Sequence, residues 1–322
     1  MMTALEILAG LALLLAGGEA MVRGAVALGR WLGLSPLVVG ILIVGVATSM
    51  PEMVVSVEAV LKGHPSIAIG NILGSNTANI LLVLGLTGLV KPLHRQRRAL
   101  VPDGILLAGS AILFGLLGMS GVITFVEGLV MFAALAGVMA WEFTRTRRET
   151  KLARELEEEL AEEVPPHPWL DHPAVAFALV ITGLAMLVYG GDLFLAGATA
   201  VADHFGVSKG VIGLTLIALG TSAPELASSL VAARHGHSDV AYGNIVGSNV
   251  INILGVGGAA AMTGPLVFPP IMSSFDAPLM IAATLLMIAF FTSKKGLTRP
   301  RAAVMAACYF GYIGLRALVL NG

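Results

Sequence analysis

Long apolar runs separated by short polar stretches make up most of the chain. Ten runs are long enough to cross a bilayer, for which a helix needs about 20 predominantly apolar residues. They cover residues 3–27, 36–61, 65–90, 101–119, 121–142, 173–200, 208–233, 238–264, 271–293 and 300–319. This pattern predicts an all-α integral membrane protein with ten transmembrane helices.

Composition supports this interpretation. The chain is 57% hydrophobic and only 12% charged, with a mean hydropathy of +0.89, so it has too few charges to cover a soluble surface. The stretch from Thr3 to Ala20 has neither a basic leader nor a small-residue cleavage site, which indicates a retained first span rather than a signal peptide. Cys308 is the single cysteine, and we expect it to face lipid or to fill a packing position.

Residues 17–85 and 190–258 repeat each other at a constant offset of 173. In these 69 ungapped positions 29 residues are identical, too many for shared apolar composition alone. The identities are densest in two polar blocks, ATSMPE with GNILGSN in the first copy and GTSAPE with GNIVGSN in the second. The chain is therefore predicted to be an internal duplication. Its parts are a first five-helix repeat (1–142), a charged linker (143–171) and a second five-helix repeat (172–322).

The basic residues predict the orientation in the membrane. With an outside N-terminus, 16 of the 19 Lys and Arg residues fall on the inner side, and only Lys62, Lys209 and Arg316 fall outside. The positive-inside rule then predicts a multi-pass protein of the inner (plasma) membrane with both termini extracytoplasmic. Since five spans per copy is an odd number, the second copy enters from the opposite side and the repeats are inverted. The linker is expected to be a solvated cytoplasmic helix or mobile connector, with regulation as the alternative.

Two carboxylates lie inside the second and seventh spans. Glu52 and Glu225 occupy matching positions, and a carboxylate at the bilayer centre costs about 2.5–3.5 kcal/mol even on lenient scales. No Lys or Arg lies in the middle of the second, third, seventh or eighth span. The missing partner is therefore predicted to be a cation that comes and goes. The alternative is a protonated, hydrogen-bonded Glu.

The residues before each Glu supply oxygen ligands. Pro51 and Pro224 each remove an amide donor and kink the second and seventh helices, which frees backbone carbonyls. Hydroxyls precede both prolines, at Thr48, Ser49, Thr221 and Ser222. Such irregular backbone is tolerated at membrane depth only where it lines a cavity. Hard oxygen donors suit Ca²⁺, which takes 6–8 of them, and Na⁺.

The third and eighth spans are predicted to complete the site. Ser75 and Asn79 are four residues apart, as are Ser248 and Asn252, so each pair projects from one helix face. Hydrogen bonding between helices, without ion contact, is the competing interpretation for these four. Small-xxx-small spacing, which allows close helix approach, occurs at Gly70, Gly74, Gly243 and Gly247.

Other polar residues are expected to have structural roles. The remaining asparagines of the repeated blocks are interpreted as structural: Asn71, Asn76, Asn244 and Asn249. Three further pairs of polar residues match between the copies. Glu19 and Asp192 are expected to assist gating or to pair elsewhere, and Asp103 and Asp276 to be helix caps or interfacial groups. His64 and His237 are expected to be turn residues, with pH sensing as the alternative. Glu58 and Glu127 have no counterpart and are left out of the site.

Both copies resemble the two alpha-repeats of the cation/Ca²⁺ exchanger superfamily, within it the prokaryotic sodium/calcium exchangers. The resemblance rests on the T-S-x-P-E and G-N-x-x-G-S-N blocks and covers essentially the whole chain. It implies ten helices in two inverted halves, with long oblique first and sixth helices that slide across a rigid core. It also implies four central ion sites formed by these residues: Thr48, Ser49, Glu52, Ser75, Asn79, Thr221, Ser222, Glu225, Ser248 and Asn252.

One position departs from the family pattern. Where well-known sodium/calcium exchangers carry an aspartate in the second copy, this chain has Asn252, which matches Asn79. The site then holds two formal negative charges. One Ca²⁺ neutralises them, whereas three Na⁺ would leave the site with a net positive charge.

The leading hypothesis is electrogenic Na⁺/Ca²⁺ antiport by a non-enzymatic secondary transporter. H⁺/Ca²⁺ antiport is the alternative, a cation channel is less favoured, and an intramembrane hydrolase lacks a base beside Ser49 or Ser222. The expected partners are Ca²⁺, Na⁺ and lipid, without a cofactor or nucleic acid, and a monomer suffices.

Overall fold

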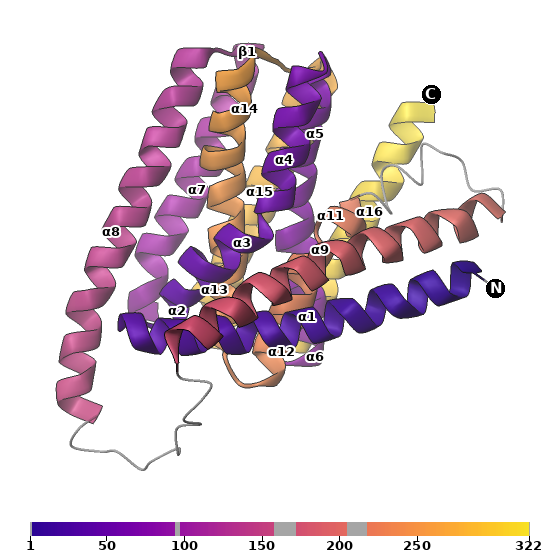
Figure 1. The fold of residues 1–322 in the computed structure, drawn as a ribbon. Helices are drawn as coiled ribbons and strands as arrows, with labels where there is room; N and C mark the ends of the chain where they lie inside the picture. The colour runs from indigo at the N-terminus through magenta and orange to yellow at the C-terminus, as the bar shows by residue number, and fades with distance from the viewer. Residues whose placement is uncertain (1, 94–96, 158–171, 205–217, 322) are drawn as a thin grey trace.

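The computed structural model describes residues 2–93, 97–157, 172–204 and 218–321, which are almost entirely helical (Figure 1). Within these residues, seven helices are long and apolar enough to cross a membrane, and an eighth span results if the bent pair Pro36–Thr48 and Met50–Leu61 is counted as one. The predicted seventh span (208–233) lies partly outside the described residues. The predicted last span forms α16 (Arg299–Asn321), which is not among the seven.

Two long helices form an oblique layer. Helices α1 (Met2–Leu32) and α9 (Pro173–His204) pack along their lengths and run crosswise to the upright helices (Figure 1). A Cβ added at Gly17 would lie 2.9 Å from the carbonyl oxygen of Gly183, and one added at Gly183 would lie 2.5 Å from the amide nitrogen of Met21. Only glycine allows two backbones to approach this closely, so the helices pack as a tight pair.

The second and third runs of the first copy are interrupted helices. The second run consists of α2 (Pro36–Val38), the π-helical segment η1 (Val39–Gly45), α3 (Val46–Thr48) and α4 (Met50–Leu61). The third consists of α5 (Pro65–Ala78), the π-helical segment η2 (Asn79–Val83) and α6 (Leu84–Val90). A π-helical turn shifts the direction in which the following side chains project, and such turns are frequent at functional sites.

The second copy repeats this organisation. It consists of α11 (Ala218–Thr221), α12 (Ala223–Arg234), α13 (Ser238–Val250), the π-helical segment η4 (Ile251–Val256) and α14 (Gly257–Thr263). The stretch that corresponds to η1 by the 173-residue offset falls almost entirely outside the described residues. The third and eighth runs are the most buried spans, at 78% and 89%, whereas Phe125–Thr144 is 17% buried. The repeated polar blocks therefore form the centre of the molecule.

The remaining helices surround this centre. They are α7 (Arg97–Met119), α8 (Phe125–Glu157), the π-helical segment η5 (Met272–Asp276), α15 (Ala277–Thr292) and α16. Helix α8 continues to Glu157, well into the predicted linker, whose residues 158–171 lie outside the described part. Helix α8 packs on α14 and α16 packs on α6, so each copy's last helix contacts the other copy's third run.

Two short backbone pairings connect the copies. Strand β1 (Val122–Ile123) pairs antiparallel with β2 (Leu266–Val267), and Leu93 forms an isolated bridge with Leu297. Leu93 and Leu266 are equivalent by the 173-residue offset, so each copy supplies the same position to a pairing with the other. The expectation of an all-α protein holds except for these few residues.

Candidate cation site

The two predicted carboxylates lie just after helix breaks. Glu52 is in the first turn of α4 and Glu225 is in the first turn of α12, each directly after a proline. The break residues Ser49 and Ser222 have nearly the same backbone angles, φ −84° and ψ −2° against φ −89° and ψ 6°. In the first copy the helix bends by 41° at this break. Each carboxylate therefore lies near a helix N-terminus, where partial positive charge favours an anion.

The two copies meet at these breaks. The Thr48 hydroxyl of the first copy lies 3.2 Å from the Ser248 hydroxyl of the second and donates to Asn244 Oδ1 at 3.3 Å. Helix α4, which carries Glu52, packs on η4, and α12, which carries Glu225, packs on η2. The two carboxylates lie close enough to interact electrostatically. The structure thus brings predicted site residues of both copies into one buried region.

Six of the ten predicted site residues have buried polar atoms with no hydrogen-bond partner among the residues described. Each copy contributes a serine hydroxyl, a carboxylate and a carboxamide, and the six residues are almost fully buried. They are Ser49, Glu52, Asn79, Ser222, Glu225 and Asn252. A buried polar group without a partner is costly. A matched set of oxygen donors is therefore available to coordinate a hard cation.

Asn71 and Asn244 hold the carboxylate-bearing helices in place. Asn71 Nδ2 donates to the Glu52 carbonyl at 3.2 Å and to Ser56 Oγ at 3.0 Å. Asn244 Nδ2 donates to the Glu225 carbonyl at 3.4 Å and, in the position equivalent to Ser56, to Ser229 Oγ at 2.9 Å. These bonds agree with the structural role expected for the two asparagines. Sequence reasoning missed the serines, although their identity at the repeat offset was a usable signal.

The other predicted ligands differ in their surroundings. Ser75 Oγ donates to Asn71 Oδ1 at 3.5 Å and Ser248 Oγ donates to Asn244 Oδ1 at 3.4 Å, so both serines already have partners within their own helices. The carboxamides of Asn79 and Asn252 instead lie in the π-helical segments η2 and η4. The sequence gave no sign of these π-helical turns.

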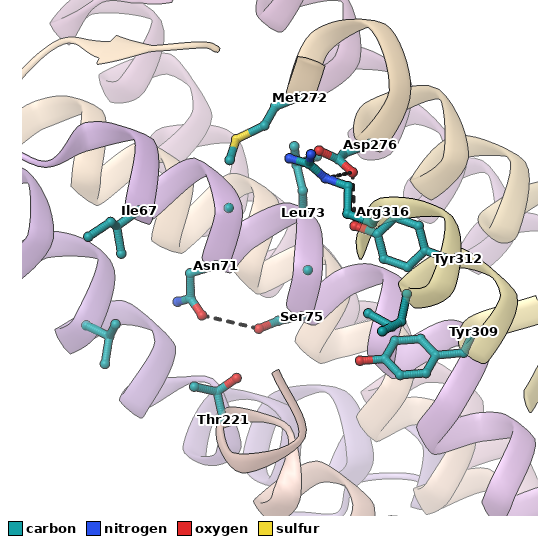
Figure 2. A pocket seen from close by; sticks show the side chains of 14 residues that line it. Ile67, Asn71, Leu73, Ser75, Thr221, Met272, Asp276, Tyr309, Tyr312 and Arg316 are labelled. Carbon is teal, nitrogen blue, oxygen red and sulfur yellow. Dashed lines mark hydrogen bonds and ion pairs between the residues drawn. The ribbon is translucent and has the colours of Figure 1, made fainter. Parts of the chain in front are cut away.

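A pocket of about 240 Å³ reaches the site from one side (Figure 2). It is lined by α5, α11, η5 and α16, and Ser75 and Thr221 lie on its wall. The close helix approach that the small-xxx-small spacing allows is found at Gly243 and Gly247 but, within the described residues, not at Gly74. Among the residues that the structure describes, Gly74 has no atom within 4 Å of an added Cβ and, with Gly70, lines this pocket. In the second copy an added Cβ at Gly243 would lie 2.4 Å from the Leu37 carbonyl oxygen.

The side chains of Asp103 and Asp276, expected to be helix caps or interfacial groups, are both buried within the protein. Asp103 lies within α7. Asp276 stands at the N-cap position of α15, as expected, but its side chain forms no capping hydrogen bond and pairs with the buried Arg316 at 3.1 Å.

Other predicted groups lie away from the site. Glu19 pairs with Arg23 at 2.5 Å and with His235 at 2.8 Å, which connects α1 to the end of α12. Its counterpart Asp192 is exposed on α9. Glu58 pairs with Lys62 on its own helix, and Glu127 accepts hydrogen bonds from Thr124 at the start of α8.

The turn and surface residues follow expectation. His64 and His237 stand at the N-cap positions of α5 and α13, each directly after a glycine with positive φ. Cys308 is exposed on α16.

Two related copies that share one buried polar centre between interrupted helices define the class of repeat-built membrane transporters. The family described as "Sodium/calcium exchanger protein" matches residues 3–144 and 175–318. The chain belongs to this family. It is therefore a multi-pass membrane protein and a cation antiporter, not an enzyme, and needs no cofactor.

Individual relatives and structures agree with this assignment. The chain is 35% identical over 312 residues to the putative antiporter CaxA of Alkalimonas amylolytica, which covers 95% of this chain and 96% of CaxA. It is 28% identical over 351 residues to the sodium/calcium exchanger MaX1 of Methanosarcina acetivorans, covering 96% and 97%. The sodium-calcium exchanger NCX_Mj, soaked with 10 mM Na⁺ and zero Ca²⁺, superposes with a TM-score of 0.80 at 27% identity, covering 97% of this chain and 98% of that one.

Proposed function

We propose that this chain exchanges Na⁺ for Ca²⁺ at one central site built from both copies. Glu52 and Glu225 provide the charge, and the other oxygen ligands come from Thr48, Ser49, Ser75, Asn79, Thr221, Ser222, Ser248 and Asn252. The names of MaX1 and NCX_Mj, both called sodium/calcium exchangers, support Na⁺ and Ca²⁺ as the transported ions.

The observation that carries this proposal is the set of six buried side chains without hydrogen-bond partners in the described part of the chain. Three come from each copy and all of them offer oxygen atoms, while the neighbouring Asn71 and Asn244 donate hydrogen bonds to the helices that carry the two carboxylates. Hard-cation chemistry needs such uncommitted oxygens.

Coupling follows from shared ligands. The two carboxylates can be neutralised by one Ca²⁺ or by Na⁺ ions at the same oxygens. They cannot bind Ca²⁺ and Na⁺ at the same time. Binding of one ion therefore excludes the other, and each return of the site across the membrane carries one kind of load. Three Na⁺ against one Ca²⁺ would move net charge, so this exchange is electrogenic.

The proposal includes a membrane arrangement. Ten helices form two inverted five-helix repeats (1–142 and 172–322), joined by a cytoplasmic linker (143–171), with proline-kinked second and seventh helices. Both termini lie on the extracytoplasmic side of an inner membrane, and a single copy suffices. The tight pair of α1 and α9, which crosses the core obliquely, is suited to slide over it and expose the site to each side in turn (Figure 1).

H⁺/Ca²⁺ antiport is the second candidate. The observation that favours it is the charge count, because Asn79 and Asn252 leave Glu52 and Glu225 as the two acidic residues of the proposed site. Two protons would neutralise these carboxylates as completely as one Ca²⁺ does. The name of CaxA, a putative antiporter, specifies no counter-ion.

Uptake of ⁴⁵Ca²⁺ into proteoliposomes distinguishes the two candidates. Vesicles loaded with Na⁺ and diluted into Na⁺-free buffer should accumulate Ca²⁺. At three Na⁺ leaving per Ca²⁺ entering, one net positive charge leaves the vesicle, so an inside-positive potential should accelerate this uptake. Uptake that follows an imposed pH gradient and ignores Na⁺ would replace Na⁺ by H⁺ as the counter-ion.

A further inference from the structure

Among the described residues, one pair of opposite charges lines the pocket beside the site. Asp276 of η5 and Arg316 of α16 are the charged residues among those that line it, and both side chains are buried, with Arg316 only 5% exposed. Ser75 and Thr221, two proposed ion ligands, line the same pocket (Figure 2). An ion that reaches these ligands through the pocket therefore passes the ion pair.

Hydrogen bonds hold the pair in a defined arrangement. Arg316 Nε lies 3.1 Å from Asp276 Oδ1, and the Tyr312 hydroxyl donates to the same oxygen at 3.0 Å. Arg316 Nη1 and the Tyr309 hydroxyl are buried and have no hydrogen-bond partner among the described residues. The guanidinium group of Arg316 has donors only and cannot coordinate a cation. It is unsuited to store a cation but well placed to influence one that passes.

The pair is absent from the first copy. By the 173-residue offset, Asp276 corresponds to Asp103, whereas Arg316 corresponds to Phe143 and Tyr312 to Met139. The arginine is thus no remnant of the duplication. It belongs to the side of the molecule where the pocket lies.

We propose that Asp276 neutralises Arg316 in the pocket through which ions approach the site, so that divalent cations are not repelled there. Arg316 alone would repel cations, and it would repel a divalent ion twice as strongly as a monovalent one. Asp276 cancels this charge, so the approach is close to neutral. This inference rests on the proposed cation exchange, though not on whether Na⁺ or H⁺ is the counter-ion.

Coulomb's law gives the expected size of the effect. An uncompensated unit charge about 8 Å from the path, in a water-like medium, changes the local concentration of a divalent ion roughly fivefold and that of a monovalent ion roughly twofold. Asp276→Asn leaves Arg316 uncompensated and should raise the apparent KM for Ca²⁺ by about this factor. Arg316→Gln leaves the carboxylate and should lower it.

Ca²⁺/Ca²⁺ self-exchange, followed with ⁴⁵Ca²⁺, measures this KM without any counter-ion. We expect the lowest KM for Arg316→Gln and the highest KM for Asp276→Asn. Wild type and the double variant Asp276→Asn/Arg316→Gln should share an intermediate KM. Arg316→Lys keeps the charge and should resemble wild type. Higher salt should bring the single variants closer together.

Sidedness provides a second readout. The shifts should appear when Ca²⁺ is supplied from the face to which the pocket opens, extracytoplasmic in the proposed topology, and not from the opposite face. Right-side-out and inverted membrane vesicles separate these cases. Impairment of both single variants in the same direction, or equal shifts from both faces, would show a merely structural ion pair and overturn the inference. If wild type lacks Na⁺-driven uptake but the KM order holds, the Na⁺ assignment fails and this inference stands.

Discussion

The two copies of the polar block have nearly the same sequence but different surroundings. On α13, Gly243 and Gly247 press against the backbone of η1, and Thr48 contacts Ser248 across the contact between copies. On α5, the equivalent Gly70 and Gly74 line a pocket, and Ser75 donates a hydrogen bond to Asn71 of its own helix. One half of the site is closed by packing and the other is reachable. A duplicated transporter that opens to one side at a time should have this asymmetry.

The largest expected effect removes the charge that both halves share. Glu52→Gln and Glu225→Gln should each reduce ⁴⁵Ca²⁺ uptake by a factor of about 100 or more, since loss of one buried carboxylate leaves Ca²⁺ uncompensated. Both variants should be equally affected although their surroundings differ. Glu58→Gln is the matched control, because Glu58 is exposed and pairs with Lys62 on its own helix. Full transport by either site variant would remove the proposed site.

The next prediction concerns closure of the open half. We assume that the pocket beside α5 closes during transport, so that α5 packs as tightly as α13 does in this structure. A bulky residue at Gly74 should then block the transport cycle without disturbing the conformation described here. Gly74→Leu should fold with an unchanged apparent Tm and transport roughly tenfold more slowly. Gly109→Leu is the control, because it also has open space around an added Cβ but lies on an exposed face of α7. Normal transport by Gly74→Leu would mean that this pocket never closes.

A single added methyl group should change the stability of the protein differently in the two copies. An added Cβ at Gly247 would lie 2.7 Å from Ile41 Cα, so Gly247→Ala should destabilise the protein by about 1–3 kcal/mol through backbone overpacking. Gly74→Ala meets nothing and should stabilise its helix by up to about 1 kcal/mol. Thermal melts of both variants in detergent measure the difference. Equal Tm changes would contradict the packing asymmetry.

The smallest effect concerns the two equivalent turns. Burial, with the positive charges of His235, Arg30 and Lys91, lowers the pKa of His237 below its ordinary value, whereas His64 is exposed. The unfolded chain therefore takes up this proton more readily than the folded one, and stability is lost as the pH falls through about 6.5 towards the lower folded pKa. His237→Gln should flatten the decline of Tm between about pH 7.5 and pH 5. His64→Gln should leave the decline unchanged.

Much of this molecule could be predicted from its sequence, because the decisive signals are local or repeated. Apolar runs located most of the spans, and the repeat offset identified Glu52 and Glu225 together with the oxygens around them. Three features could not be read this way. The π-helical turns depend on packing. The Asp276–Arg316 pair could not be found from the repeat, because the position equivalent to Arg316 in the first copy is Phe143. The open and closed halves cannot be distinguished from two copies of one motif, since the difference lies in conformation.

The pairings between the copies also affect how the chain is made. Leu93 pairs with Leu297, and β1 pairs with β2 near Leu266, so two loops of the first copy form backbone pairings with the second. During synthesis these loops emerge long before their partners. The first copy therefore cannot complete its fold while the ribosome is still translating the second. A chain that ended at the linker would lack both of these backbone pairings.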